Sequence, residues 1–274
     1  MRERALPVLR ALSERPTLLA LALACAVALS TSLVGAAGLP HAPALRIGLV
    51  LGAWAALAAL IAFLFTPGFD LPGRAIRRVP GGRRVALTFD DGPHPETTPA
   101  LLAALRRAGV RATFFVVGEA VDRWPDLVRQ IAADGHVLGN HTQRHRLLTF
   151  RTSAQVAEEV AACQRALARV GVRARLFRPP HGFKSVGLHS VLRRHGLRLV
   201  AWQGSLRDTD APGTGIIVER AVAVAGAGRI LLLHDQPGCR EQTIDAVPAI
   251  IERYRALGYE LALLEDAIVD GRRT

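Results

Sequence analysis

Two parts of the chain differ in how their apolar residues are spaced. Apolar residues run almost without interruption over 17–39 and over 47–66, and neither run contains an Asp, Glu, Lys or Arg. About 20 helical residues reach across the roughly 30 Å hydrocarbon core of a membrane. The pattern therefore predicts a membrane segment at 1–66 with two transmembrane helices, at about 17–39 and 46–66. The first run is alternatively a cleaved signal peptide, because arginines precede it and small residues follow it.

Beyond a basic linker rich in Gly and Pro at 67–83, the apolar residues fall into short blocks with two alternating spacings. Blocks of strand length occupy 84–89, 113–117, 137–139, 175–177, 197–202, 229–233 and 259–264. Blocks with helical spacing occupy 97–108, 125–133, 153–170, 186–194, 216–225 and 244–257. Such alternation is typical of parallel strands joined by helical crossovers, so we predict an α/β domain at 84–270. About seven units fit, which suits a distorted (β/α) barrel or an open doubly wound sheet.

The formal net charge of +12 would suit a nucleic-acid-binding protein, but the position of the charge favours another interpretation. Residues 1–84 contain ten Arg and three acidic residues, so +7 of the excess lies there. Nine of these arginines lie before the first apolar run or after the second, whereas the link between the runs holds only Arg46. The positive-inside rule then predicts a multi-pass protein of the inner (cytoplasmic) membrane with a cytoplasmic catalytic domain. Membrane lipid is the expected partner and nucleic acid is not; a periplasmic or extracellular catalytic domain is the alternative.

Polar residues of catalytic type follow the predicted strands at their carboxyl ends, where parallel α/β folds place reacting groups. Asp90 and Asp91 follow the first strand, and His141 and His145 follow the third. Residues four apart lie on one face of a helical turn, so the two imidazoles are expected to bind one ion. Two His and one carboxylate form a catalytic zinc-type ligand set that leaves a position for water. Adjacent Asp side chains in an extended strand point apart, so we expect one to bind metal and the other to act as a base.

Four short motifs resemble those of a known enzyme family in their order and spacing. They are T-F-D-D-G-P-H-P from Thr88, H-T-Q-R-H from His141, R-P-P-H-G from Arg178 and L-L-L-H-D from Leu231. Together they resemble the polysaccharide deacetylases of carbohydrate esterase family 4, which share the NodB-homology domain. The resemblance covers about 85–267 and leaves out the membrane segment. It implies a NodB-type distorted (β/α) barrel and a metal-dependent hydrolysis of N-acetyl groups on amino sugars.

The resemblance implies roles for several residues of the first three motifs. Asp90 resembles the catalytic base, and Arg178 resembles the arginine that orients this base. Asp91, His141 and His145 resemble the ligands of a divalent metal ion, usually zinc. An ion in this position would polarise the amide carbonyl and activate a water molecule.

The same resemblance places the leaving-group chemistry on the later motifs. His234 resembles the general acid that protonates the leaving amine, and Asp208 resembles the carboxylate that tunes it. Leu232 resembles the apolar residue that lines the acetyl pocket, and the backbone N–H of His181 is expected to stabilise the oxyanion. Two positions depart from the family pattern, because His181 replaces the usual Tyr and Thr209 replaces the usual Trp. These departures indicate a substrate other than an extended polymer, or a different acyl group such as formyl.

The sequence thus predicts a metal-dependent hydrolase that removes an N-acyl group, in the first instance acetyl, from an amino sugar. The sugar belongs to a polysaccharide, an oligosaccharide or a lipid-linked glycan. Two alternatives stay open: a deformylase-type enzyme that acts on a lipid-linked sugar, and a catalytically silent, membrane-anchored homologue that binds sugar. No obligate protein partner is inferred from the sequence.

Overall fold

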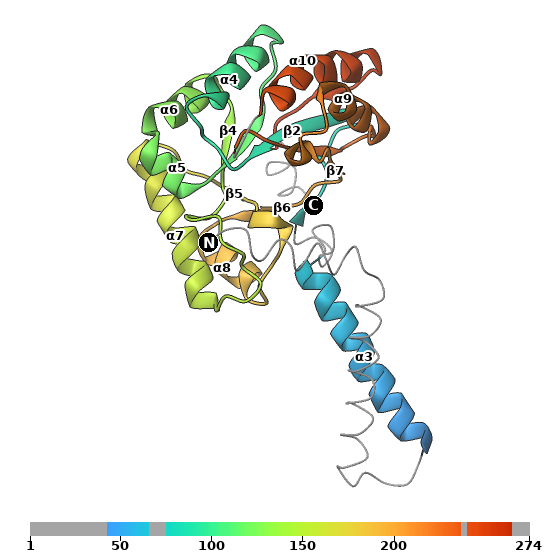
Figure 1. The fold of residues 1–274 in the computed structure, drawn as a ribbon. Helices are drawn as coiled ribbons and strands as arrows, with labels where there is room; N and C mark the ends of the chain where they lie inside the picture. Colours follow the sequence, from blue (N-terminus) through green and yellow to red (C-terminus); the bar gives the residue numbers. More distant parts are fainter. Residues whose placement is uncertain (1–42, 66–74, 237–239, 265–274) are drawn as a thin grey trace. The chain divides into compact units, whose positions relative to one another are not determined.

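The chain divides into two compact units, Met1–Ala62 and Phe63–Thr274. The computed structural model describes residues 43–65, 75–236 and 240–264. The second unit contains the predicted α/β domain and holds every candidate site residue named above (Figure 1).

Helix α3, Pro43–Phe65, consists almost entirely of apolar residues, and Ala and Leu, which have high helix propensity, are the most frequent. It forms where the second apolar run predicts a helix. The predicted helix at 17–39 lies outside the described residues. In the described part of the chain, no helix is long and apolar enough to cross a membrane.

The second unit is built on one curled parallel sheet. Its strands are β1 (Ala75–Ile76), β2 (Arg84–Asp90), β3 (Thr113–Val116), β4 (Val137–Asn140), β5 (Leu176–Phe177), β6 (Arg198–Val200), β7 (Gly204–Ser205), β8 (Ile230–His234) and β9 (Glu260–Leu261). The order across the sheet is β1-β6-β5-β4-β3-β2-β8-β7, and β9 pairs with the beginning of β2. Among the described strands β1 and β7 are the edges and do not pair with each other. The sheet is therefore a half-barrel, and not the closed or doubly wound arrangement that the alternation also allowed (Figure 1).

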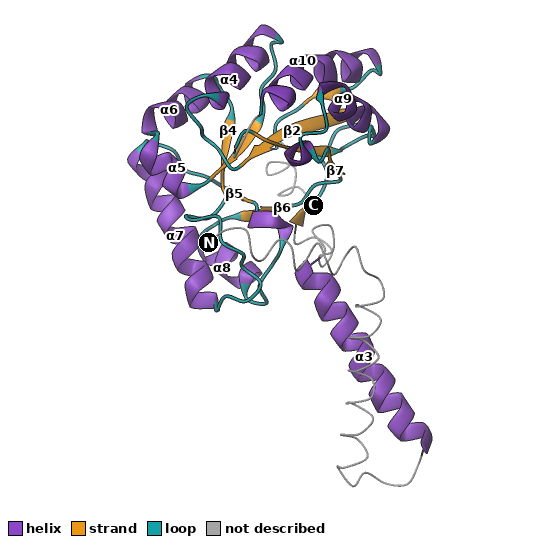
Figure 2. Ribbon diagram, in the orientation of Figure 1, coloured by secondary structure: helices purple, strands orange, loops and turns teal. Residues whose placement is uncertain are grey.

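Helices connect the strands and surround the sheet on its outer side (Figure 2). They are α4 (Thr97–Arg107), α5 (Gly118–Arg123), α6 (Pro125–Ala133), α7 (Ser153–Arg169), α8 (Leu188–Arg194), α9 (Thr214–Ala223) and α10 (Glu241–Ala256). Helix α7 begins with a capping box, in which Thr152 and Gln155 exchange side-chain and backbone hydrogen bonds. Short 3-10 turns, η1 (Pro180–Gly182) and η2 (Asp208–Asp210), lie in the loops that carry site residues.

The predicted strands and helices of 84–264 all form, with ends that shift by a few residues. Three elements were not predicted: β1, which lies inside the predicted linker at 67–83, and β7 and α5. Strands β1 and β7 have two residues each, so neither has enough positions to show a period-2 pattern.

Side chains alternate between two cores on the two faces of the sheet. Along β2, Val85, Leu87 and Phe89 pack into the large core beneath the helices, whereas Ala86 belongs to a smaller core on the inner face. Successive side chains of a strand point to opposite faces, so Thr88 and Asp90 share the inner face with Ala86. The carboxylate of Asp90 is therefore directed to the concave side of the half-barrel, away from the helices.

Candidate active site

The carboxyl ends of β2 and β8 place two predicted catalytic residues next to each other. These strands are parallel neighbours, and their register pairs Asp90 with His234. The backbone continues to pair where the strands end: the Asp91 N–H donates to Phe115 O at 3.2 Å, and the Asp235 N–H donates to Asp90 O at 3.2 Å. The beginnings of the site loops are therefore fixed by the ladder itself.

A cluster of three candidate metal ligands lies beside this pair. Asp91 Oδ1 is 3.3 Å from His141 Nε2 and 3.0 Å from His145 Nε2. One ligand atom from each of these three residues lies within 4.8 Å of the other two. Asp91 Oδ1 is buried and forms no hydrogen bond of good geometry with a described residue, although two imidazole nitrogens face it. A carboxylate oxygen and two nitrogens that converge in this way fit a divalent cation.

The imidazole of His141 is held in the tautomer that a metal ligand needs. His141 Nδ1 lies 2.7 Å from the carbonyl oxygen of Arg178, which can only accept a hydrogen bond. The proton is therefore on Nδ1, and the lone pair of Nε2 faces Asp91. Burial raises the pKa of the Asp91 carboxyl group, but the two imidazoles that face it lower this pKa well below its usual value.

The two histidines do not lie on a helical turn, which corrects the expectation from their spacing. The segment from His141 to His145 is an irregular loop in which Thr142 and His145 have positive φ angles of 68° and 50°. The Asn140 side chain accepts a hydrogen bond from the Thr142 N–H at 2.9 Å and fixes this turn. The two rings nevertheless approach to 4.9 Å between centroids, so the chain reaches the predicted ligand pair by a different backbone path.

Unusual backbone conformations are concentrated around the site. The described non-glycine residues with positive φ are Asp91, Thr142, His145, His181, Arg207 and Ala211. All six lie in the loops that carry the candidate ligands or in those next to the other predicted site residues. Left-handed conformations cost energy in residues other than glycine and tend to occur where function requires a side chain to be aimed.

Helix α7 supports the ligand loop through a buried carboxylate that the sequence did not single out. Glu159 accepts hydrogen bonds from the backbone N–H of Arg144 at 2.9 Å and from its guanidinium at 3.1 Å. Arg144 precedes His145, so Glu159 anchors the loop between the two histidines. Its position on the buried side of an amphipathic helix is the one sequence signal that sets Glu159 apart.

The candidate base is bound to a fully buried arginine. Arg178 Nη1 lies 2.7 Å from Asp90 Oδ1 and donates a second hydrogen bond to Thr88 Oγ1 at 2.7 Å. The guanidinium stacks over Phe115 at 4.2 Å, which fits cation–π contact. Burial lowers the pKa of Arg178, and the negative charge of Asp90 opposes this effect. Sequence reasoning missed Thr88, which shares the inner face of β2 with Asp90.

A second pair of opposite charge lies across from the first. His234 Nδ1 is 2.9 Å from Asp208 Oδ1, and the His234 backbone N–H donates to Asp208 Oδ2 at 2.8 Å. Thr243 adds a third hydrogen bond to Asp208 Oδ2 at 3.0 Å. Burial lowers the pKa of His234, but the hydrogen bond and charge of Asp208 outweigh it and leave the pKa raised. Burial likewise opposes ionisation of Asp208, but His234 and Thr243 lower its pKa.

The remaining predicted residues surround these two pairs. Leu232 lies two residues before His234 on β8 and shares its inner face; it is buried and belongs to neither apolar core. The exposed His181 has a positive φ of 58°, and its ring centroid is 4.8 Å from that of His145. Burial, together with the nearby His145, lowers the pKa of His181 to about 4. Thr209 is exposed in the turn after Asp208.

Asp235 is a buried carboxyl group that underlies the loop after β2. Its Oδ2 accepts a hydrogen bond from Thr98 Oγ1 at 2.7 Å. A Cβ atom added to Gly92 would lie 2.2 Å from the same oxygen, so only glycine fits at that position. Burial raises the pKa of Asp235 to about 7. Its place directly after His234 in the L-L-L-H-D motif was the available sequence signal.

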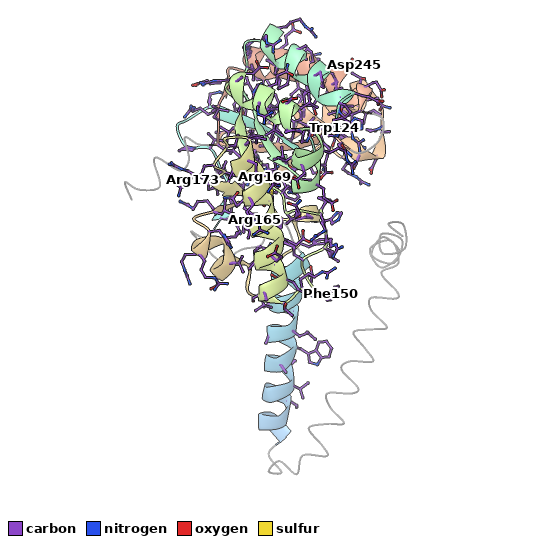
Figure 3. All side chains as sticks on the ribbon, turned by 90° about the vertical axis from the view of Figure 1, so that its left-hand side faces the viewer. Trp124, Phe150, Arg165, Arg169, Arg173 and Asp245 are labelled. Atoms are coloured by element: carbon purple, nitrogen blue, oxygen red, sulfur yellow. The ribbon has the colours of Figure 1, made fainter. Side chains whose placement is uncertain are left out.

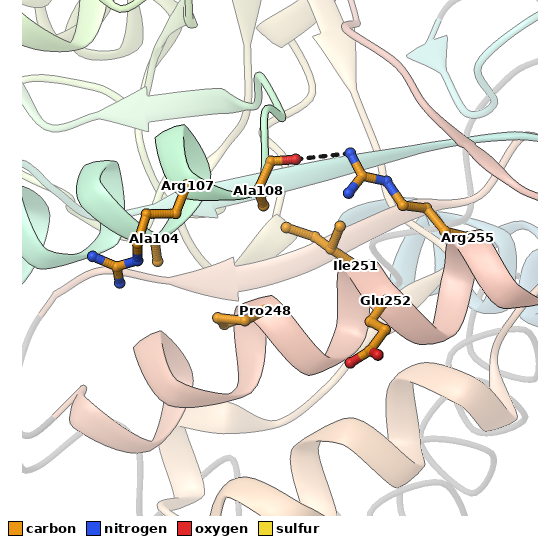
Figure 4. Close-up of a pocket in the computed structure, with 7 residues that line it drawn as sticks. All are labelled: Ala104, Arg107, Ala108, Pro248, Ile251, Glu252 and Arg255. Atoms are coloured by element: carbon orange, nitrogen blue, oxygen red, sulfur yellow. Dashed lines mark hydrogen bonds between the residues drawn. The ribbon is translucent and has the colours of Figure 1, made fainter.

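A cavity of about 280 Å³ lies elsewhere, between helices α4 and α10 (Figure 4). Ala104 and Arg107 line it from α4, and Pro248 and Ile251 line it from α10. Its lining contains no predicted site residue and no histidine. The chemistry is therefore located at the strand ends and not in this cavity.

Comparison with known proteins matches the same part of the chain. The family described as "Polysaccharide deacetylase" matches residues 77–200. A chitooligosaccharide deacetylase of Azorhizobium caulinodans is 34% identical over 204 residues, which are 69% of this chain and 96% of that protein. A peptidoglycan-N-acetylglucosamine deacetylase of Bacillus cereus is 33% identical over 193 residues, which are 69% and 91%. The structure of a family 4 carbohydrate esterase from Streptomyces lividans, in complex with acetate, is 34% identical with a TM-score of 0.63 and covers 67% and 94%.

Proposed function

Because the chain belongs to the polysaccharide deacetylase family and is a hydrolase of non-peptide carbon–nitrogen bonds, we propose that it removes the acetyl group from an N-acetylated amino sugar. The observation that carries this proposal is the placement of two oppositely charged pairs, Asp90 with Arg178 and His234 with Asp208, on neighbouring strands. The candidate ligands lie beside them, since His141 Nε2 is 3.8 Å from Asp90 Oδ2. A base, an acid and a cation site thus meet at one sheet edge.

We assign Asp91, His141 and His145 as ligands of a divalent ion, in the first instance zinc, because two imidazoles and one carboxylate suit it. When bound, such an ion supplies Lewis-acid polarisation of the amide carbonyl and lowers the pKa of water. The chain itself keeps the ligands ready, because the hydrogen bond from His141 Nδ1 to the Arg178 carbonyl fixes one ring. Glu159 fixes the loop that carries the other.

Asp90 is assigned as the general base. Arg178 occupies Oδ1, so the carboxylate is held in one orientation and Oδ2 is directed toward the ligand cluster. From there Oδ2 accepts a proton from the water that attacks the amide carbonyl. Because Arg178 is also fixed by Thr88 and by the Phe115 ring, the base has little freedom to turn away.

His234 is assigned as the general acid. An amine leaves a tetrahedral centre only after its nitrogen is protonated, so the acid must carry a proton near neutral pH. Asp208 meets this need by raising the pKa of His234, and its hydrogen bond to Nδ1 leaves Nε2–H as the donor. The proton passes from His234 Nε2 to the sugar nitrogen as the carbon–nitrogen bond breaks.

The acyl pocket and the oxyanion site are assigned to residues near the two pairs. Leu232 offers an apolar surface for the acetyl methyl group, on the face that also carries His234. The backbone N–H of His181 is proposed to donate to the oxyanion. His181 has a left-handed backbone conformation, and its ring lies next to that of His145. An exposed Thr209 leaves the entrance without an aromatic wall.

The relatives' names suggest the sugar. They are called chitooligosaccharide deacetylase and peptidoglycan-N-acetylglucosamine deacetylase, so we propose an N-acetylglucosamine-type glycan as the substrate. A lipid-linked form of this glycan is the more specific proposal. It is supported by the predicted membrane association of 1–66 and by the departures at His181 and Thr209.

Acetate release from a soluble chitooligosaccharide by the purified full chain tests this function. We expect turnover that is lost on chelation and restored by a divalent ion, and that falls by at least about 100-fold in Asp90→Asn. Asp245→Asn, an exposed substitution on α10, is the matched control. A chain that binds the sugar but releases no acetate with any divalent ion would instead support the silent homologue, and formate release from an N-formyl analogue would support the deformylase.

The membrane location is a proposal that rests on the sequence pattern of 1–66. Cell fractionation with an alkaline carbonate wash tests whether the chain is held by lipid. A reporter fused after Thr274 tests the side: green fluorescence without alkaline phosphatase activity is expected for a cytoplasmic catalytic domain. Phosphatase activity would place the domain outside the cytoplasm.

A further inference from the structure

The loops that carry His145 and His181 each contain a large apolar side chain that is exposed. Phe150 is 80% exposed and Val186 is 74% exposed, the highest values among the large apolar residues that the structure describes as exposed. In the same loop as Phe150, Leu148 is fully buried, and a hydrogen bond from the Arg151 N–H to Leu148 O closes the turn. The loop therefore anchors one apolar residue in the core and presents the other outward.

The two exposed side chains belong to one part of the active-site edge. Phe150 precedes α7 and Val186 precedes α8, so both lie in loops that begin at the carboxyl ends of neighbouring strands, β4 and β5. The end of the second loop meets the beginning of α7, which directly follows the first loop, because a Cβ atom on Gly187 would overlap Ser153 Oγ. We define the rim patch as Phe150, Val186, Arg146 and Arg151.

The charge of the rim patch is positive. Neither 141–152 nor 178–187 contains an Asp or Glu. Arg146 and Arg151 flank Phe150 in the chain, and within the described residues neither forms an ion pair. Figure 3 shows Phe150 at one end of α7 and Arg165 and Arg169 farther along the helix.

The arginines on α7 differ from those of the patch in having acidic partners. Arg165 pairs with Glu158 at 2.7 Å, and Arg169 pairs with Asp122. Arginines that form ion pairs with neighbouring carboxylates in this way are typical of an ordinary solvent-exposed surface. Arg146 and Arg151 instead keep their charge beside an exposed aromatic ring, which is the combination found where proteins meet anionic lipid.

We propose that the rim patch binds the surface of an anionic lipid membrane and turns the active-site edge toward the headgroups. Phe150 and Val186 enter the boundary between headgroups and acyl chains, and the two arginines bind lipid phosphates. The described helix α3 also exposes apolar side chains, Ile47 and Leu51, which supports lipid as a partner of this chain. The proposal deepens the proposed function, on which it rests for the identity of the substrate: it selects a glycan presented at a lipid surface.

A glycan is the other occupant to consider, because aromatic rings also stack on sugars. Sugar sites supplement the ring with polar groups that bind hydroxyls, such as carboxylates and amides. The two loops provide no carboxylate, and Val186 is aliphatic. The combination of one aromatic, one aliphatic and two basic side chains therefore favours lipid.

Quenching of a tryptophan at position 150 by brominated phospholipids tests the contact directly. The full-length Phe150→Trp variant is measured against the unsubstituted chain, whose three tryptophans give the background. We expect strong quenching in vesicles of phosphatidylcholine with phosphatidylglycerol. Replacement of Arg146 and Arg151 by Gln should weaken this contact about 30-fold, since each basic residue near an anionic surface contributes about 1 kcal/mol.

Leu257→Trp provides the matched control, because Leu257 is exposed at the end of α10, before β9, and thus at the opposite edge of the sheet. Quenching at position 150 that is no stronger than at position 257 would overturn the proposal. So would equal quenching in vesicles of phosphatidylcholine alone and in vesicles that contain phosphatidylglycerol. Circular dichroism of each variant verifies that the chain is folded.

Kinetics separates lipid from glycan contact. The double variant Phe150→Ser, Val186→Ser is assayed on a vesicle-borne and on a soluble substrate. The ratio of the two kcat/KM values, vesicle-borne over soluble, should fall about tenfold or more, because a large apolar side chain is no longer buried in lipid. If the kcat/KM values for the vesicle-borne and the soluble substrate both fall and their ratio stays unchanged, the rim patch contacts the glycan and the lipid proposal is wrong. If the wild-type chain hydrolyses neither substrate, the proposed function fails, while the quenching experiment still decides the lipid contact.

Discussion

Substitution of Asp208 by Asn should shift the alkaline limit of activity. Asp208 is almost fully buried and accepts hydrogen bonds from the ring and backbone of His234 and from Thr243. Asn is nearly isosteric: its amide group replaces Oδ2 and loses that acceptor for the His234 backbone N–H, but its carbonyl oxygen can still accept from His234 Nδ1. The orientation of the ring is therefore kept, and the main change is the loss of the negative charge that stabilises the imidazolium.

The size of the shift follows from the strength of this hydrogen bond. A hydrogen bond to a charged group contributes about 1.5 to 3 kcal/mol, and one pKa unit corresponds to about 1.4 kcal/mol. Loss of the charge-assisted bond should therefore lower the pKa of His234 by about 1 to 2 units. His234 is proposed to act in its protonated form, so kcat/KM should begin to decline at a pH that is lower by the same amount.

The assay is the pH profile of kcat/KM for acetate release, measured on metal-saturated protein. Asp208→Asn should keep much of its activity at the acidic end, whereas Asp208→Ala should lose activity at every pH, because the ring is no longer oriented. Thr243→Val is the matched control: it removes one neutral donor from Asp208, so the alkaline limit should stay or move slightly upward. An Asp208→Asn profile with an unchanged alkaline limit would refute the assignment of His234 as an acid tuned by Asp208.

Three further outcomes are expected. His145→Ala should weaken divalent-ion binding by more than about 100-fold, measured by equilibrium dialysis and elemental analysis, whereas His195→Ala should bind normally. Arg178→Gln leaves the buried Asp90 without its partner, so urea unfolding should show a loss of about 3 to 5 kcal/mol, and a loss below about 1 kcal/mol would contradict the buried pair. Burial lowers the pKa of His136 from 6.5 to about 4, and its Nδ1 accepts from the Ala112 N–H. Between these pH values the unfolded chain binds a proton that the folded chain does not, so the free energy of unfolding should fall by about 3 kcal/mol as the pH is lowered, and His136→Gln should flatten that slope.

Most helices and strands, and the residue types of the candidate site, could be predicted from the sequence, because both depend on local pattern. The apolar run of β2 and the helical spacing of α7 are both clear in the sequence, and these elements form where expected. The two-residue strands β1 and β7 depend on neighbours distant in the chain, namely β6 and β8, so no local signal marks them. The same applies to Glu159, whose role arises only when α7 packs beside the ligand loop.

The ligand loop shows where spacing is an insufficient guide. An i, i+4 pair of histidines predicts a helical turn, but His141 and His145 are brought together by left-handed residues and by the Asn140 side chain. The spacing paired two residues that the structure also brings together, but it predicted the wrong backbone conformation. The energy that holds such a loop comes from tertiary contacts, including the buried Glu159, and these are invisible in a local pattern.

Some residues of the site lie on paired strands and others lie in loops, and this difference explains how substrate specificity can change without loss of catalysis. Asp90 and His234 are register partners on adjacent strands, so the distance between the proposed base and acid is set by the parallel ladder. His181 and Thr209 lie in loops outside the ladder, and both are exposed. Substitution there changes what can approach the two strands while the register between them stays the same. The departures from the family pattern are therefore expected to alter the choice of acyl group or glycan, and to leave the proton transfers at Asp90 and His234 intact.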